Sequence, residues 1–177
     1  QLFDKAREIE GLLIRDFLTG AFNRKFFMDR FYEEASWAHR YGEPISIVMI
    51  DIDLFKKIND RYGHCTGDHV LQQVSSIVTS HLRGNDVFAR FGGEEFIILM
   101  PNTDADEAFA FAETLREVIA RSEFYSDDQL RFSVTISAGV ATFHGEPEIT
   151  MDNILCRADA ALYQAKEQGR NIVIRAF

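Results

Sequence analysis

The sequence lacks the features that mark several large classes of protein. It has three prolines and two cysteines, and Cys65 and Cys156 form no Cys-x-x-Cys pair and have no metal-binding spacing. No apolar run approaches the roughly 20 residues needed to cross a bilayer, and residues 1–5 lack the basic and apolar parts of a signal peptide. We therefore expect a soluble, cytoplasmic domain, although the full-length protein could be attached to a membrane.

Basic residues are also scarce. The 19 lysines and arginines are outnumbered by 28 aspartates and glutamates, which gives a formal net charge of −9. Sequence-independent binding to a nucleic acid needs a basic face that displaces condensed counterions. We therefore expect no nucleic acid partner, although an acidic protein can still hold a nucleotide through a metal and a few cations.

The length suits one domain. The chain has 177 residues, of which 46% are hydrophobic, and it has neither a repeat nor a low-complexity linker. It starts at glutamine, and residues 4–15 already have a helical pattern. We expect residues 1–15 to be the end of a connector helix from a longer chain, and residues 16–177 to be the catalytic or binding domain.

A glycine pair followed by two acids is the most informative segment. Gly92, Gly93, Glu94 and Glu95 stand between two apolar, β-prone runs at 87–91 and 96–100. The pattern predicts a hairpin with acid at its tip, and we expect the glycines to provide positive φ angles in the turn.

A second apolar run, at residues 45–50, also ends in acids, Asp51 and Asp53. If this strand neighbours the hairpin, Asp51 and Glu94 converge on one point. Mg²⁺ takes one or two protein carboxylates and fills its other positions with water and phosphate oxygens. The sequence therefore predicts a site for a hard divalent cation, with Asp53 as an ordinary strand-end acid.

The order of elements predicts an α+β fold. Apolar spacing indicates helices at 23–40, 67–82, 104–121 and 151–168, and strands at 45–50, 132–140 and 171–175 besides the hairpin. One mostly antiparallel sheet with helices on a face, an α+β sandwich, accommodates this order best.

Several motifs together resemble the GGDEF family, the diguanylate cyclases of bacterial signalling, in its GGEEF variant. The matching segments, in order, are Asp16-Phe17-Leu18-Thr19-Gly20 with Asn23-Arg24, Asp51 to Asp60 with Gly63-His64 and Gly67-Asp68, Gly92 to Phe96, and Ala158-Asp159 to Asn171. The resemblance runs from about Asp16 to the C-terminus.

The resemblance implies a palm-like fold, similar to polymerases and class III nucleotide cyclases. It also implies condensation of two GTP molecules into cyclic di-GMP with release of pyrophosphate. The active species would be a homodimer with one GTP in each protomer and Mg²⁺ or Mn²⁺ as cofactor. An upstream sensor domain would control it.

The same resemblance assigns the reacting end of the site. Asp51, Glu94 and the backbone carbonyl of Ile52 would hold the metal. Glu94 would also accept the proton of the attacking hydroxyl, Glu95 would assist, and Lys56 would stabilise charge on the transferring phosphate.

Substrate contacts follow in the same way. Asn59 and Asp68 complement the Watson-Crick edge of guanine, and His64 lies between them with a contact role only. Lys166 and Arg170, four apart in the last predicted helix, would bind the terminal phosphates.

Arg83 and Asp86 resemble the family's inhibitory product site, which binds cyclic di-GMP. Thr114 stands where a second arginine is common in the family, and Arg116 is a nearby substitute. We therefore expect product inhibition at this position, with the residue that provides the second arginine contact left open.

Two other functions remain open from the residues. A domain of this fold can serve as a non-catalytic receptor for cyclic di-GMP or GTP, but Asp51, Lys56 and Glu94 are all present, and a receptor would not need them. A mononucleotide cyclase shares the chemistry, but Asn59 with Asp68 favours guanine over adenine. Taken singly, each motif is also compatible with an ordinary turn, cap or solvated face.

Overall fold

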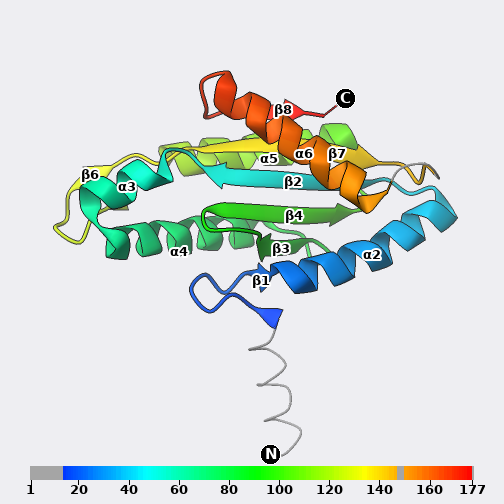
Figure 1. The fold of residues 1–177 in the computed structure, drawn as a ribbon, viewed down its shortest axis with the longest axis horizontal. Coiled ribbons are helices and arrows are strands. Elements are labelled where there is room, and N and C mark those ends of the chain that lie inside the picture. Colours follow the sequence, from blue (N-terminus) through cyan, green and yellow to red (C-terminus); the bar gives the residue numbers. More distant parts are fainter. Residues whose placement is uncertain (1–13, 147–149, 177) are drawn as a thin grey trace, which may run out of the picture.

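A computed structural model describes residues 14–146 and 150–176, and its centre is a six-stranded, mostly antiparallel sheet (Figure 1). The strand order is β1-β3-β4-β2-β7-β8, where β1 is Phe22–Asn23, β2 is Ile45–Ile52, β3 is Val87–Arg90, β4 is Glu95–Pro101, β7 is Ile136–Phe143 and β8 is Val173–Arg175. Only the pairs β1·β3 and β7·β8 are parallel. A separate two-stranded sheet joins β5 (Phe124–Tyr125) and β6 (Arg131–Phe132).

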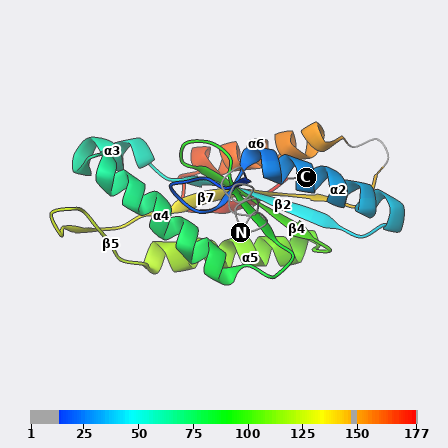
Figure 2. The same cartoon turned by 90° about the horizontal axis from the view of Figure 1, so that it is seen from below.

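The expected α+β fold, a mostly antiparallel sheet flanked by helices, is confirmed, and the helices are divided between the two faces of the sheet. The helices are α2 (Arg24–Tyr41), α3 (Phe55–Tyr62), α4 (His64–His81), α5 (Ala105–Arg121) and α6 (Met151–Glu167). Figure 2 shows α4 and α5 on one side, and α2 and α6 on the other. The reason is visible in β2, whose eight residues are all buried: a strand that is apolar on both faces needs cover on both.

Alternate residues of β2 face two hydrophobic cores. Val48 and Ile50 belong to the core beneath α4 and α5, and Ile47 and Met49 belong to the core beneath α2 and α6. This alternation is the period of two that a β-strand imposes. Because every side chain of β2 is fixed from one side or the other, the acids at its end project from a rigid strand.

The expected helix starts at Asn23 and Asp104 are confirmed by side-chain caps. The side chain of Asn23 accepts a hydrogen bond from the backbone N–H of Phe26 at 2.9 Å. Asp104 accepts from the N–H groups of Asp106 and Glu107, and the Glu107 side chain accepts from the N–H of Asp104, which completes a capping box.

Two segments differ from the predicted elements. The strand expected at 132–140 starts at Ile136, because Phe132 pairs instead with Phe124 in the β5–β6 hairpin. Residues 55–62, for which the sequence predicted no helix or strand, form helix α3, in which only Ile58 is buried. Phe55, Ile58 and Tyr62 do have helical spacing, but the 8 residues of α3 are fewer than the roughly 11–18 over which a 3.6-residue period is judged.

Helix α6 lies against the backbone of β7. Gly139, in the middle of β7, faces Ala158, Ala161 and Leu162, and a Cβ atom at this glycine would overlap the backbone of α6. The close approach of helix and strand therefore depends on the missing side chain.

The connector helix expected at residues 1–15 falls almost wholly outside the described residues. Within 14–146 and 150–176, no helix is both long and apolar enough to cross a membrane.

Candidate functional site

The acids of β2 and of the hairpin converge at one end of the sheet, as predicted. Strands β2 and β4 are antiparallel neighbours, and Asp51 is the register partner of Glu95. The N–H of Ile52 donates to the carbonyl of Glu94 at 3.2 Å. Asp51, Ile52 and Glu94 therefore lie side by side at the end of two paired strands.

The hairpin turn uses its glycines differently from the expectation. Neither Gly92 nor Gly93 has a positive φ angle. The N–H groups of Phe91 and Gly92 both donate to the carbonyl of Glu95, at 2.8 and 3.2 Å, and a Cβ at Gly92 would lie 2.7 Å from Oε2 of Glu95. A Cβ at Gly92 would therefore displace the carboxylate of Glu95, and Gly92 does not serve a left-handed backbone.

Asp51 is the electrostatic centre of the site. Its side chain is 9% exposed, and Lys166 Nζ donates to its Oδ2 at 2.7 Å. Burial raises the pKa of Asp51 to about 6; Lys166 opposes the rise, and the charges of Glu94 and Glu95 add to it. The fold thus holds three carboxylates close enough to repel one another, with one lysine to compensate.

These oxygens fit a hard divalent cation. Asp51 and Glu94 offer carboxylates and Ile52 a backbone carbonyl, which is the donor type that Mg²⁺ and Mn²⁺ prefer. Among the residues that the structure describes, no group of three or more His, Cys, Asp or Glu side chains forms a ready metal cage. Two carboxylates with a carbonyl leave positions for water and phosphate oxygens, as Mg²⁺ requires.

A buried acceptor without a partner marks the second part of the site. Asn59, on α3, has a buried Oδ1 atom with no hydrogen-bond partner, the one such side-chain atom within residues 14–146 and 150–176. This atom packs against Gly67 of α4. Asp68 and His64, also on α4, are exposed nearby in the sequence. An orphaned buried acceptor costs about 1–3 kcal/mol, so a donor on a bound ligand would stabilise it.

The candidate phosphate-binding residues occupy three elements. Lys56 lies on α3 and is exposed, and Lys166 lies in the last turn of α6. Arg170 is not on α6, contrary to the expectation of one helix, because α6 ends at Glu167. Its N–H donates to the Ala165 carbonyl at 3.0 Å, and its φ is 66°, so it belongs to the turn that closes the helix.

Asp53 is structural, as the sequence indicated. Its carboxylate accepts hydrogen bonds from the Thr135 hydroxyl at 2.7 Å, the Ser137 hydroxyl at 2.6 Å and the Asn171 N–H at 2.9 Å. The hydrogen bond from Asn171 also fixes the turn that carries Arg170. The sequence indicated that Asp53 is an ordinary strand-end acid but could not identify these three donors, which come from segments more than 80 residues away.

Arg83 and Asp86 form a turn at the start of β3. The N–H of Arg83 donates to Asp86 Oδ2 at 2.8 Å, and the N–H of Asp86 donates to the Arg83 carbonyl at 3.1 Å. Burial raises the pKa of Asp86, and the hydrogen bond from Arg83 opposes this rise. The Arg83 side chain is left exposed.

Arg116 does not complete this turn within one protomer. It is bound by Glu113 and donates to Asn171 Oδ1 at 3.2 Å, and Asn171 lies beside Asp53, beyond the C-terminal end of β2. Asp86 precedes β3, at the level of the N-terminal end of β2. Six residues of strand, roughly 20 Å, separate these levels. Thr114 instead donates to Ala110 on its own helix.

The chain matches the family described as "Diguanylate cyclase, GGDEF domain" over residues 13–172. It is 40% identical over 164 residues to the response regulator PleD of Caulobacter vibrioides, which covers 92% of this chain and 36% of that protein. It is 47% identical over 131 residues to diguanylate cyclase A of Treponema denticola, covering 74% of this chain and 35% of the relative. The chain thus spans about a third of the length of these relatives.

Solved structures agree with the sequence relatives. The coiled coil and GGDEF domain of DgcB from Caulobacter crescentus, in complex with c-di-GMP, superimposes with a TM-score of 0.93 at 30% identity, covering 99% of this chain and 92% of that one. The active GGEEF domain of a Vibrio cholerae diguanylate cyclase superimposes with a TM-score of 0.81 at 36% identity, covering 89% and 97%. The chain belongs to the GGDEF family of diguanylate cyclase domains.

Proposed function

We propose that this domain condenses two GTP molecules into cyclic di-GMP and releases two pyrophosphates. The observation that carries the proposal is the convergence of Asp51 and Glu94 at one strand end, with a buried Asn59 oxygen that lacks a partner. A relative of similar sequence that is named a diguanylate cyclase supports the same conclusion.

The reaction needs three things: in-line attack of a ribose 3′-hydroxyl on an α-phosphorus, removal of the hydroxyl proton, and dispersal of charge on the phosphates. A divalent metal, Mg²⁺ in our proposal, supplies Lewis-acid charge at the phosphates when bound. Asp51, Glu94 and the Ile52 carbonyl hold it, Glu94 accepts the proton, and Glu95 assists.

The remaining side chains bind and orient GTP. The carbonyl oxygen of Asn59 and the carboxylate of Asp68 accept from the N–H groups of guanine, and the amide group of Asn59 donates to the base oxygen. His64 makes a contact to the base. Lys56 stabilises charge on the transferring phosphate, and Lys166 and Arg170 bind the terminal phosphates.

Two copies must face each other for the ring to close, because one chain has one such site. We propose a homodimer whose contacts are weak in the isolated domain, and a connector before residue 16 that carries a signal from an upstream sensor. The similarity to DgcB, solved with its coiled coil, supports this arrangement. Cyclic di-GMP is then both product and ligand of the Arg83–Asp86 turn.

The test is product chromatography after incubation of the purified chain with GTP and Mg²⁺ at high protein concentration. We expect cyclic di-GMP and pyrophosphate from the wild type, and neither from Glu94→Gln. Glu33→Gln, which removes an exposed carboxylate of α2, is the matched control and retains synthesis. Unreacted GTP with folded, dimeric wild type would favour a receptor, and a cyclic mononucleotide would favour the other cyclase class.

A further inference from the structure

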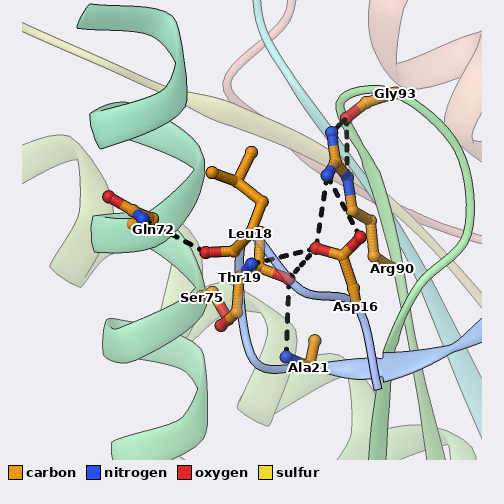
Figure 3. A network of polar contacts seen from close by, with 8 residues as sticks. All are labelled: Asp16, Leu18, Thr19, Ala21, Gln72, Ser75, Arg90 and Gly93. Carbon is orange, nitrogen blue, oxygen red and sulfur yellow. Dashed lines mark hydrogen bonds and ion pairs between the residues drawn. The ribbon is translucent and has the colours of Figure 1, made fainter. Parts of the chain in front are cut away.

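One arginine joins two motifs that are more than 70 residues apart in the sequence. Arg90, the last residue of β3, donates from Nε and Nη2 to the carbonyl of Gly93, at 3.1 and 2.7 Å. Its Nη1 donates to both carboxylate oxygens of Asp16, at 3.2 and 3.3 Å. Figure 3 shows the guanidinium between the two. Only guanidinium has donors in a planar fork that serve both groups at once.

Asp16 is a fixed anchor. Its carboxylate also accepts from the N–H and the hydroxyl of Thr19, at 2.9 and 2.7 Å. Burial acts to raise the pKa of Asp16, but the hydrogen bonds from Thr19 and the charge of Arg90 outweigh it and lower the pKa below its usual value. Asp16 is therefore ionised at neutral pH and held in one orientation.

The turn that contains Asp16 is also bound to helix α4. Ser75 donates from its hydroxyl to the Thr19 carbonyl at 2.9 Å, and Gln72 donates to the Leu18 carbonyl at 3.2 Å. Figure 3 shows Gln72 and Ser75 on the side of the turn away from Arg90. The anchor thus rests on a helix of the core, and movement of Arg90 would have to break several contacts.

The other end of the arginine acts on the peptide group that precedes Glu94. Gly93 is exposed, no atom lies near the position of a Cβ there, and among the described residues its carbonyl accepts only from Arg90. The carbonyl of Gly93 and the N–H of Glu94 belong to one planar peptide group. Fixing that plane fixes the position of the Glu94 Cα atom, and the Ile52 N–H holds the carbonyl on the other side of Glu94, so together the two contacts restrict the direction of the Glu94 side chain.

We propose that Arg90, held by Asp16, is a positioning residue for Glu94. The role of Glu94 in this inference rests on the proposed function. The positioning of Glu94 by Arg90 rests only on the contacts of the hairpin. Removing either partner would leave the fold and GTP binding in place and let the tip of the hairpin move. Partners of a ligating group typically change metal affinity or activity by about 10–100-fold.

The experiment compares Arg90→Lys and Asp16→Asn with two control variants. Lysine keeps the charge but cannot bind Gly93 and Asp16 together, and asparagine keeps an acceptor for Thr19 but loses the charge. Arg30→Lys and Glu34→Gln are the matched controls, because Arg30 also joins two acceptors, Glu33 and Glu34, on α2. The double variant of Arg90 and Asp16 completes a cycle.

We expect kcat for cyclic di-GMP synthesis to fall by about 10–100-fold in either test variant, with KM for GTP within about threefold of the wild type. The double variant should lose no more than the worse single variant, because both changes break one link. The controls should retain the wild-type kcat. A rise in KM with an unchanged kcat, or additive losses, would overturn the proposal.

A readout without catalysis separates this proposal from the proposed function. The Ile52 N–H donates to the Glu94 carbonyl, so its hydrogen exchange, followed by NMR, reports whether the tip stays in place. We expect faster exchange at Ile52 and weaker Mn²⁺ binding by electron paramagnetic resonance in the test variants, with unchanged exchange at Val48. Should the wild type make no cyclic di-GMP, these two measurements still decide. Unchanged exchange and metal binding, or faster exchange throughout the core, would refute the positioning role.

Discussion

Lys166 Nζ donates a hydrogen bond to Asp51 Oδ2 over 2.7 Å, and this contact joins a proposed phosphate ligand to a proposed metal ligand. In the absence of substrate each group thus has the other as its counter-ion. The contact lowers the cost of holding Asp51 beside Glu94 and Glu95. On binding of a metal and of GTP, Asp51 would contact the metal and Lys166 a phosphate, in place of their contact with each other.

We therefore predict that Lys166→Gln strengthens Mn²⁺ binding by the nucleotide-free protein at pH 8 by about 3–10-fold, since a competing cation is gone. The same change should raise KM for GTP. Electron paramagnetic resonance titration measures the first effect. Lys25→Gln, an exposed lysine of α2, removes the same charge and should change neither quantity. Weaker Mn²⁺ binding in Lys166→Gln would show that the lysine does not compete for Asp51.

The raised pKa of Asp51 predicts how stability depends on pH. A carboxyl whose pKa rises from 3.8 to about 6 on folding holds its proton more tightly in the folded state, so its contribution to the free energy of unfolding falls as the pH rises through 4 to 6. Asp51→Asn should then raise the free energy of unfolding at pH 8 by about 1–2 kcal/mol and change it little at pH 4. Urea denaturation at both pH values is the measurement.

Asp53→Asn is the control for that prediction, and we expect the opposite sign. An amide cannot accept all three hydrogen bonds that Asp53 accepts, so the variant should be less stable than the wild type at pH 8. Equal effects of the two substitutions would mean that holding Asp51 beside the other site acids does not lower the free energy of unfolding.

Gly67→Ala should weaken GTP binding without loss of stability. A Cβ at Gly67 would overlap Oδ1 of Asn59, so the Asn59 side chain must leave its position. Alanine favours a helix over glycine by up to about 1 kcal/mol, which offsets the local crowding. We expect KM for GTP to rise about tenfold with no fall in the melting temperature. Ser76→Ala, exposed on the same helix, should leave KM unchanged; an unchanged KM in Gly67→Ala would remove Asn59 from the base site.

Arg83→Ala should weaken binding of cyclic di-GMP at least tenfold. The Arg83 side chain is exposed and ready to contact an anion, whereas the turn around it is held by backbone contacts that alanine retains. Isothermal titration calorimetry in a Glu94→Gln background measures the affinity without turnover. Arg121→Ala, an exposed arginine of α5 paired with Glu117, is the matched control. Equal affinity in the two variants would place the product site elsewhere.

The sequence predicted the elements that have strong periodic patterns and missed those that depend on distant contacts. Strand β2, the hairpin of β3 and β4, and the helix starts near Asn23 and Asp104 follow from local residues alone. Helix α3 has only 8 residues, too few for its helical spacing to be recognised over the longer window that such a pattern needs. The strand expected at 132–140 starts only at Ile136, because Phe132 pairs with Phe124 in the β5–β6 hairpin, a contact that no local pattern encodes.

Within the site, the positions of the acids were predictable and their partners were not. The approach of Asp51 to Glu94 needed only that two predicted strands be neighbours. The contact between Lys166 and Asp51 spans 115 residues, and that between Arg90 and Asp16 spans 74. Such pairs depend on how helices and turns pack on the sheet, which residue type and spacing do not specify.

Gly139 contacts none of the proposed ligand-binding side chains, yet it determines how near α6 can come to the sheet, and with it where Lys166 is held. A side chain at this position would therefore push α6 outward and displace Lys166, although Gly139 itself is not a proposed ligand contact. A design that transfers this site to another sheet must therefore include a glycine at the position of Gly139, together with the acids and the lysine.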